Sequence, residues 1–322
     1  MAVPMHFIQP KGLAIASQSL INALALVCKR GTPNMETRSF GPQEEKLPVL
    51  GLGCGRVGSL GNPTPLSEIR NTLARALELG VTLFDTADIY GQGESEREIG
   101  RLLRGHGEKA FVVTKVGYCF SKKMQLMRHL KPLLKPLIAC SPKARRQVAL
   151  QRRSADMSSD FSPSYIVNAV DASLRRLAGE TVDGLLLHDP PAGILATTRA
   201  TGVLAKLKTS GKIRHYGVSC TDLETVRATL AMPGVTLMQL RLALMDAIVT
   251  AGLSETIRQS RIAIIVREVL ISQPYLRPAT AVKQAVEHDL VTSAIVGISK
   301  REHLEELANV VAKAPTIAKL VS

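Results

Sequence analysis

Cysteine is scarce in this chain of 322 residues and follows no recognised pattern. The number of cysteines is odd and no two of them form a Cys-x-x-Cys pair: Cys28, Cys54, Cys119, Cys140 and Cys220. Neither a disulfide framework nor a zinc site is therefore predicted, and no other metal-ligand spacing is present. A protein with these thiols fits best in a reducing cytoplasm.

A long uninterrupted apolar run is also missing. The best candidate, residues 12–27, follows Lys11 but is broken by Ser17, Gln18, Ser19 and Asn22, and no clear small-x-small cleavage site follows it. A membrane span needs about 20 mainly apolar residues. We therefore predict no signal peptide and no membrane association. Residues 1–34 are interpreted as a non-domain extension before a natural start at Met35, with one domain over 35–315 and a tail over 316–322.

Acidic residues are absent from residues 116–155. The chain carries 41 basic and 27 acidic residues, a net charge of +14, and ten of those excess charges fall in this segment. Its only aromatic residues are Tyr118 and Phe120, both at its start, and it resembles no nucleic-acid module. No nucleic-acid partner is predicted. The segment 116–160 is interpreted either as a solvated basic face or as an insertion that attracts anionic substrates.

The Gly-rich stretch 51–55 lacks the dinucleotide fingerprint, because Arg56 stands where a third glycine belongs. Eight apolar runs without a polar period do recur along the chain, separated by amphipathic helical patterns. They cover residues 48–53, 81–85, 110–115, 182–188, 214–220, 235–239, 262–268 and 293–299. Strands buried on both faces have this appearance, so we predict an α/β fold, a single (β/α)8 barrel with a short N-terminal hairpin around Gly41-Pro42.

Local signals predict where several helices begin. Thr64 followed by Pro65, and Ser162 followed by Pro163, indicate an N-cap with proline in the first turn. Ser95-x-x-Glu98 and Ser299-x-x-Glu302 have the spacing of a capping box. The second of these boxes would direct free backbone N–H groups toward the barrel mouth, where barrels often bind phosphate.

Polar residues follow the apolar runs at the expected carboxyl ends of the strands, where barrel enzymes carry their chemistry. Considered one at a time, each of these residues has an ordinary structural interpretation. Asp85 would be an N-cap, Tyr90 a loop residue, Lys115 a surface group and His188 a structural histidine. Their convergence on one rim instead predicts a proton-transfer site, with Asp85 as the ionic partner of a buried Lys115. Ser219, Gln239, Arg267 and Ser299 occupy equivalent positions on the other runs.

The chain resembles the aldo-keto reductase family, in particular its bacterial members. The resemblance rests on the segments METRSFG (35–41), LGLG (50–53), FDTADIYG (84–91), TKVG (114–117), DGLLLH (183–188), GKIRHYGVS (211–219), Gln239 and IVGISKREHLEEL (295–307). It implies a catalytic tetrad of Asp85, Tyr90, Lys115 and His188. For the cofactor it implies contacts from Ser219, Cys220, Gln239, Arg267, Gly297, Ser299, Lys300 and His303. Cys220 stands where relatives commonly have asparagine, and Arg267 where many have an aromatic residue.

The implied activity is an NAD(P)-dependent oxidoreductase that acts on an aldehyde, ketone or sugar carbonyl, with NADPH preferred and NAD also usable. Lys115 is expected to lower the pKa of the Tyr90 phenol, which supplies the proton, while His188 orients the carbonyl oxygen. The protein is expected to be a monomer or weak oligomer, with a small carbonyl substrate that is either neutral or anionic. The alternative is a barrel that binds cofactor but turns over poorly, as a sensor or partner subunit.

Overall fold

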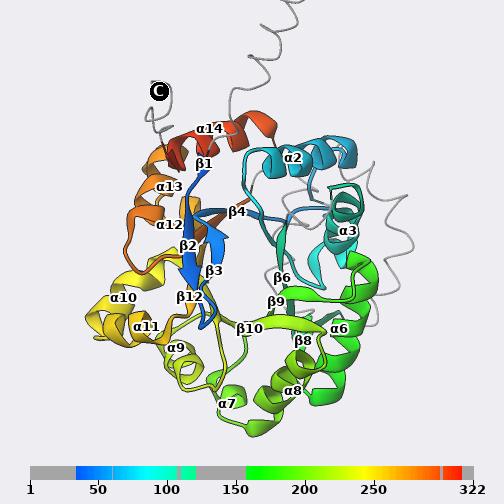
Figure 1. Ribbon diagram of the computed structural model, residues 1–322, viewed down its shortest axis with the longest axis vertical. Helices are drawn as coiled ribbons and strands as arrows, with labels where there is room; N and C mark the ends of the chain where they lie inside the picture. The colour runs from blue at the N-terminus through cyan, green and yellow to red at the C-terminus, as the bar shows by residue number, and fades with distance from the viewer. Residues whose placement is uncertain (1–33, 60, 107–109, 121–156, 298–299, 314–322) are drawn as a thin grey trace, which may run out of the picture.

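The computed structural model describes residues 34–59, 61–106, 110–120, 157–297 and 300–313 (Figure 1). Eight parallel strands close into a barrel in the order β10-β11-β12-β13-β4-β5-β6-β9. Their bounds are β4 Leu50–Gly53, β5 Leu83–Asp85, β6 Phe111–Val116, β9 Val182–His188, β10 Ile213–Cys220, β11 Leu237–Arg241, β12 Ala263–Arg267 and β13 Ser293–Val296. Each lies within or close to one of the eight predicted apolar runs, so the (β/α)8 prediction is confirmed.

Helices surround the barrel (Figure 1). In chain order they are α2 Leu66–Glu78, α3 Glu94–His106, α6 Pro163–Leu177, α7 Ala192–Leu195, α8 Thr198–Thr209, α9 Leu223–Leu230, α10 Met245–Thr250, α11 Ser254–Ser260, α12 Val269–Ser272, α13 Pro278–Glu287 and α14 Arg301–Val311. Two short 3-10 helices, η1 Tyr90–Gln92 and η2 Leu242–Leu244, follow β5 and β11. None of the helices in the described part of the chain is long and apolar enough to cross a membrane.

The core has two layers, as a closed barrel requires. One cluster fills the barrel interior and includes Leu83, Val113, Leu186 and Leu237. A larger cluster lies between the strands and the surrounding helices. Successive side chains of a strand point to opposite faces, so each strand supplies both layers, and this explains why the strands read as continuous apolar runs.

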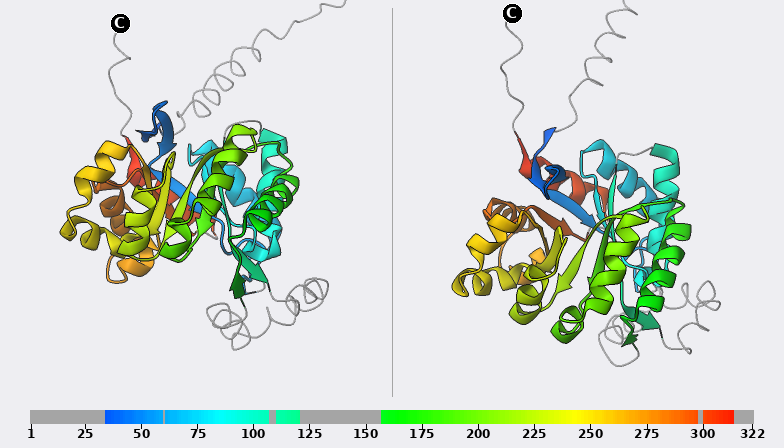
Figure 2. Two further views of the ribbon diagram at one scale, coloured as in Figure 1. Left: turned by 90° about the horizontal axis from the view of Figure 1, so that it is seen from below. Right: turned by 60° about the horizontal axis from the view of Figure 1, so that its bottom comes forward.

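The two ends of the barrel carry different antiparallel strand pairs. The antiparallel hairpin of β2 Thr37–Phe40 and β3 Glu45–Pro48, which was predicted, inserts Phe40 and Leu47 into the interior cluster. The antiparallel pair β7 Tyr118–Phe120 and β8 Met157–Ser159 lies at the opposite end (Figure 2). At the hairpin's end, β1 Asn34–Met35 pairs with β14 Ala312–Lys313, so the first and last described segments lie side by side.

Helix starts were predicted less well than strands. Helix α6 begins as predicted, with the Ser162 hydroxyl accepting from the backbone N–H of Tyr165 and Pro163 in the first turn. The Thr64 prediction was wrong by one residue, because Pro65 itself is the N-cap of α2. The predicted capping boxes were also wrong, since α3 begins at Glu94, before Ser95, and the N-cap of α14 is Lys300.

Candidate active site

Polar side chains gather at the carboxyl ends of the barrel strands. Asp85 ends β5, Lys115 lies one residue before the end of β6, and His188 ends β9. Strand pairing brings these elements together, because β6 lies between β5 and β9 in the barrel. The three side chains are at least nine-tenths buried. The rim predicted from the sequence is therefore one continuous polar cluster in the fold.

The centre of the cluster is an ion pair. Lys115 Nζ lies 2.6 Å from Asp85 Oδ1 and also donates to the backbone oxygen of Thr86 at 2.9 Å. Gln239 Nε2 donates to the same Asp85 Oδ1 at 2.7 Å. Burial lowers the pKa of Lys115, but the charge of Asp85 and the nearby Tyr90 raise it above the ordinary value. Lys115 therefore carries a fixed positive charge at the base of the mouth.

Tyr90 lies beside that charge, with the centroid of its ring 5.1 Å from Lys115 Nζ. Burial raises the pKa of Tyr90 more than Lys115 lowers it, so the net shift is upward. Lys115 does lower the pKa of Tyr90 as predicted, but this effect is smaller than that of burial. The physical reason is that desolvation of the phenolate outweighs one nearby cation, and the phenol consequently keeps its proton at neutral pH.

The loop that carries Tyr90 is tightly constrained. Gly91 has a φ of +59°, and a Cβ at that position would come within 2.5 Å of the backbone oxygen of Val57. Gly55 packs against the Tyr90 ring from the other side, with its would-be Cβ 3.5 Å from the ring. Only glycine is compatible with the first position. The Gly-rich segment after β4 therefore serves to seat the Tyr90 loop.

His188 is flanked by aromatic rings. Tyr90 lies 5.8 Å away and Tyr118 4.7 Å away, both centroid to centroid and both edge-on. Burial, together with the charges of Lys115 and Arg267, holds the pKa of His188 well below its usual range, so the imidazole is neutral. Its buried Nδ1 has no hydrogen-bond partner among the described residues. A neutral imidazole can donate one hydrogen bond without carrying charge.

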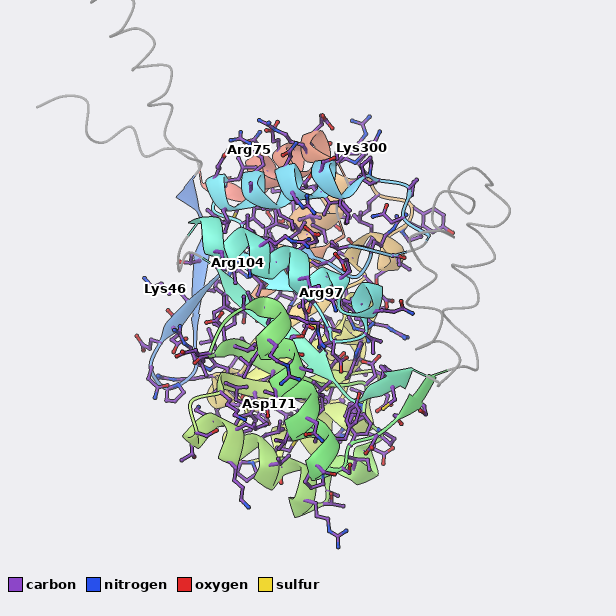
Figure 3. All side chains as sticks on the ribbon, turned by 90° about the vertical axis from the view of Figure 1, so that its right-hand side faces the viewer. Lys46, Arg75, Arg97, Arg104, Asp171 and Lys300 are labelled. Carbon is purple, nitrogen blue, oxygen red and sulfur yellow. The ribbon has the colours of Figure 1, made fainter. Side chains whose placement is uncertain are left out.

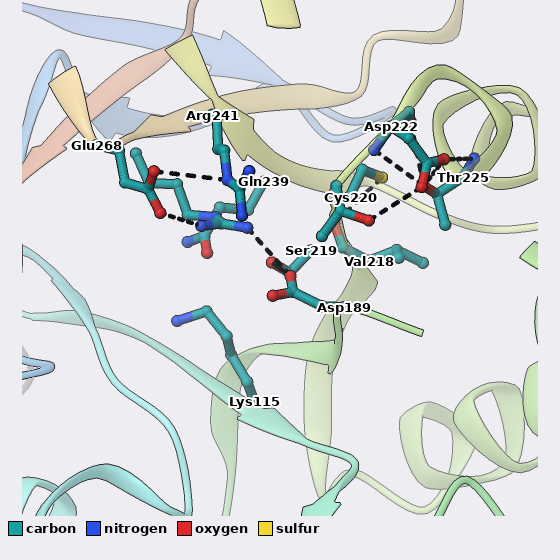
Figure 4. Close-up of polar contacts among 12 residues, drawn as sticks. Lys115, Asp189, Val218, Ser219, Cys220, Asp222, Thr225, Gln239, Arg241 and Glu268 are labelled. Carbon is teal, nitrogen blue, oxygen red and sulfur yellow. Dashed lines mark hydrogen bonds and ion pairs between the residues drawn. The ribbon is translucent and has the colours of Figure 1, made fainter. Parts of the chain in front are cut away.

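A second polar network lies across the mouth (Figure 4). Asp189 Oδ1 accepts a hydrogen bond from Ser219 Oγ at 2.5 Å and another from Arg267 Nη2 at 3.2 Å. Arg267 Nη1 donates to Glu268 Oε1 at 2.7 Å, and Arg241 Nε lies 3.5 Å from Glu268 Oε2. The network joins the ends of β9, β10, β11 and β12. It places two arginines and two carboxylates next to the Lys115 cluster.

The remaining predicted cofactor residues are placed unevenly. Cys220 faces the other way from Ser219, since its buried Sγ lies 3.4 Å from Thr229 Oγ1 of α9. The Cys220 side chain is thus directed toward α9, because neighbouring strand residues point to opposite faces. Gly297 follows β13 directly, while Lys300 and His303 are exposed at the start of α14. Ser299 lies outside the described residues.

Four mouth residues were not predicted: Tyr118, Asp189, Arg241 and Glu268. Asp189 and Glu268 each come directly after a strand, and both adopt a positive φ, +50° and +58°. Residues other than glycine rarely take that conformation, and it commonly marks functional sites. A polar residue just beyond a predicted strand was the available signal. Backbone conformation, which distinguishes these residues from ordinary loop positions, cannot be read from the sequence.

The base of the basic segment 116–160 lies at the mouth. Gly117, with a φ of +132°, connects β6 to β7, and a Cβ there would lie 2.2 Å from the Phe161 ring. Tyr118 of β7 contacts His188, so the segment leaves the barrel on the side that carries the polar cluster. That the insertion as a whole lies on the catalytic face stays a prediction. Residues 121–156, with all ten basic side chains, lie outside the described part.

Comparisons with known proteins agree with this geometry. The model of the aldo/keto reductase family matches residues 49–277. The chain is 26% identical over 208 residues to the Schizosaccharomyces pombe aldo-keto reductase yakc, whose name carries NADP(+), covering 64% of this chain and 52% of that protein. It is 30% identical over 188 residues to the Escherichia coli methylglyoxal reductase YeaE, covering 58% and 51%. The matches thus span about half the length of these relatives.

Solved structures share the fold over most of the chain. An aldo-keto reductase from Bacillus halodurans in its holo form has a TM-score of 0.68 at 21% identity, covering 88% of this chain and 92% of that one. An aldo/keto reductase from Klebsiella pneumoniae in complex with NADP and acetate has a TM-score of 0.60 at 19% identity, covering 88% and 92%. At such identities the likeness bears on the fold alone.

Proposed function

Because the chain belongs to the aldo/keto reductase family, we propose that it is an NADP-dependent oxidoreductase that transfers hydride between nicotinamide and the carbonyl carbon of an aldehyde, ketone or sugar. The observation that carries the proposal is the buried Lys115–Asp85 ion pair beside a protonated Tyr90, with neutral His188 next to the same phenol. Such a cluster can supply a proton to the oxygen of a carbonyl group whose carbon accepts the hydride.

Each residue of the tetrad has a distinct role in this proposal. Tyr90 holds a proton at neutral pH and gives it to the carbonyl oxygen as that oxygen gains negative charge. Lys115 stabilises the negative charge that then develops on the phenol oxygen, and Asp85 holds the ammonium in position. His188 donates a hydrogen bond to the same carbonyl oxygen and orients it. In the oxidative direction Tyr90 takes the proton back.

The residues around the mouth fit a nicotinamide. The cofactor supplies or accepts the hydride, and its carboxamide needs one acceptor and one donor. Gln239 Oε1 is buried and has no partner among the described residues, so it can accept from the amide N–H. The Ser219 hydroxyl can donate to the amide oxygen once it leaves Asp189. Arg267 Nε, also buried and without a described partner, is a further donor at the same rim.

The adenosine-phosphate end is assigned to the segment from Gly297 to His303. Lys300 is exposed and makes no ion pair within the described residues, so it is free to meet a phosphate. Arg301, next to it, already binds Glu305 at 2.9 Å. A 2′-phosphate would favour such a cationic helix start. We therefore propose that NADPH is preferred over NADH, with Lys300 contributing more than Arg301.

The runner-up, a cofactor-binding barrel without turnover, is not favoured. A sensor would have no need for a buried lysine held by an aspartate beside a protonated tyrosine, since such a pair is expensive to bury. Titration of nicotinamide fluorescence followed by a panel of aldehydes separates the two. Binding of NADPH without oxidation of NADPH by any aldehyde would support the sensor instead.

The deciding variant is Tyr90→Phe, which removes one oxygen atom and the transferable proton. General acid catalysis contributes about 10²–10⁴-fold, so kcat should fall by at least about a hundredfold. The dissociation constant for NADPH should stay within about twofold. Tyr275→Phe is the matched control, because Tyr275 is 99% exposed and should leave kcat unchanged. If Tyr90→Phe kept more than about a tenth of the kcat, Tyr90 would not be the acid.

A further inference from the structure

Five arginines line one cavity on the outer wall of the barrel. The cavity has a volume of about 520 Å³ and lies between α3 and α6, lined by Arg97, Arg101, Arg104, Ala172, Arg175 and Arg176. We call it the α3–α6 arginine groove. Figure 3 shows α3 on this side of the molecule, with Arg97 and Arg104 labelled along it.

Part of this positive charge is explained by carboxylates of α3. Glu96 is fully buried and accepts from Arg176 Nε at 2.5 Å. Glu98 is fully buried as well and binds both Arg101 and, from α2, Arg70. A buried carboxylate needs such partners, because an unpaired one is strongly destabilising. These contacts account for three arginines as structural neutralising groups.

The rest of the charge has no such explanation. Arg97 shares the half-buried Glu94 with Arg101, at 3.2 and 3.7 Å. Arg104 and Arg175 are exposed and make no ion pair or hydrogen bond within the described part of the chain. Among the described residues, six arginines, Arg70 included, share three glutamates, so three positive charges around one hollow have no described carboxylate partner. Crowding like charges in this way raises the free energy of the folded protein unless an anion offsets it.

We propose that the α3–α6 arginine groove binds a small multivalent oxyanion, a molecule with two or more linked phosphate groups. Guanidinium groups match phosphate oxygens in pairs, and several in one hollow favour a ligand with several such groups. The carboxylates anchor the groove by fixing Arg101 and Arg176 from beneath. The lining contains no aromatic ring on which a base could stack, which disfavours single-stranded nucleic acid.

This site is distinct from the proposed cofactor site. The groove lies between α3 and α6, which follow the barrel strands β5 and β6 in the chain. Ser219, Gln239 and Arg267 belong to β10, β11 and β12. Neither β5 nor β6 pairs with any of these three strands. NADPH at the mouth should therefore neither compete with nor require the anion. Binding can be measured with NADPH saturating, so a failure of the groove and a failure of the proposed reaction are separable.

The test uses the full chain and inorganic tripolyphosphate as the probe, measured by titration calorimetry in saturating NADPH. The variant is Arg104→Ala/Arg175→Ala, which removes the two arginines without described contacts and so should leave the fold intact. Arg199→Ala/Arg227→Ala is the matched control, because both residues are exposed, lie on α8 and α9, and lower the net charge equally. Equal thermal midpoints of all three proteins would exclude misfolding.

The groove variant should raise the dissociation constant at least about tenfold, the size of one charge-assisted contact, and the control should stay within about twofold. Affinity of the wild type should fall as salt rises. Equal weakening in both variants would mean that net charge alone attracts the ion. An unchanged value in the groove variant would put the ion elsewhere, and so would binding to the wild type that is seen only when NADPH is left out. Binding of an oligonucleotide but not of tripolyphosphate would refute a small ligand.

Discussion

Removing the Lys115 charge provides the strictest test of how the centre of the mouth is held together. Lys115→Met keeps an unbranched apolar stem but deletes the ammonium 2.6 Å from Asp85 Oδ1. The two side chains are 1% and 7% exposed, so solvent cannot take over the lost interaction. Asp85 would retain one described side-chain donor, Gln239 Nε2. A buried carboxylate would then lack its counter-charge.

Breaking a buried ion pair by removing one partner typically costs about 3–5 kcal/mol. We expect the free energy of unfolding of Lys115→Met to fall by that amount, measured from urea unfolding at pH 8 without cofactor. The double variant Lys115→Met/Asp85→Asn leaves no buried charge unpaired and should recover most of the loss. Both proteins should lack carbonyl reductase activity, because the double variant restores the fold but not the cation beside Tyr90.

Comparing the single and double variants tests whether the loss of stability is electrostatic. If Lys115→Met unfolded within about 1 kcal/mol of the wild type, the pair could not be desolvated as the structure describes. If the double variant were no more stable than the single one, the loss would come from packing of the lysine stem and not from the abandoned carboxylate. Either result would contradict the stated electrostatic origin of the destabilisation.

Three further predictions follow from the same geometry. Burial raises the pKa of Asp88 to about 8, so its contribution to stability should decline as pH rises from about 4 to about 8, since the unfolded chain loses that proton first; Asp88→Asn should flatten this slope in unfolding curves, and parallel curves would refute it. Lys300→Ala/Arg301→Ala should raise the dissociation constant for NADPH about tenfold and leave that for NADH unchanged; an unchanged NADPH value would put the phosphate elsewhere. If the basic residues of 116–160 attract anions, kcat/KM for a carboxylated aldehyde should fall with salt while that for its neutral analogue stays level; parallel salt responses would leave the segment a plain solvated face.

The barrel could be predicted from the sequence because its strands are buried on both faces. Such strands read as apolar runs whatever the helices around them do, and a polar residue ends the run where the strand meets the mouth. Asp85 and Lys115 were predicted to pair on that basis, and they do. Here a local signal and its tertiary consequence coincide, because strand order alone brings the two ends together.

The two predicted capping boxes were wrong because the same residue types serve two purposes. Ser95-x-x-Glu98 has the letters of a capping box, yet Ser95 Oγ donates to the backbone oxygen of Cys54 and Glu98 binds Arg70. Both side chains are fully buried, so tertiary contacts decide their role. The spacing of these two residues is visible in the sequence, but their burial is not. The net shift of the Tyr90 pKa could not be predicted for the same reason, since the weight of desolvation depends on everything packed around the ring.

The direction of the Cys220 side chain could be predicted from the sequence, whereas the network around Asp189 could not. Ser219 and Cys220 are consecutive in one strand, so only one of them can face the interior, and the period of two was visible in the sequence. Asp189, by contrast, meets Arg267 from a position 78 residues away, on a different strand. Nothing local to either residue indicates the other. Contacts of that range become visible only once the barrel order places β9, β10 and β12 around one mouth.

The orientation of Gln239 shows how the ion pair and the proposed cofactor contact depend on each other. An amide side chain has one donor end and one acceptor end, and which of them faces the mouth is set by its neighbours. Asp85 Oδ1 accepts from Gln239 Nε2 and from Lys115 Nζ, so the carboxylate fixes the donor end inward. Gln239 Oε1 is thereby left as the acceptor. Asp85 therefore has two functions in the proposed reaction: it holds the cation beside Tyr90 and it presents the acceptor for the nicotinamide amide. Replacing it should weaken proton transfer and cofactor binding together, although it would touch neither substrate nor cofactor.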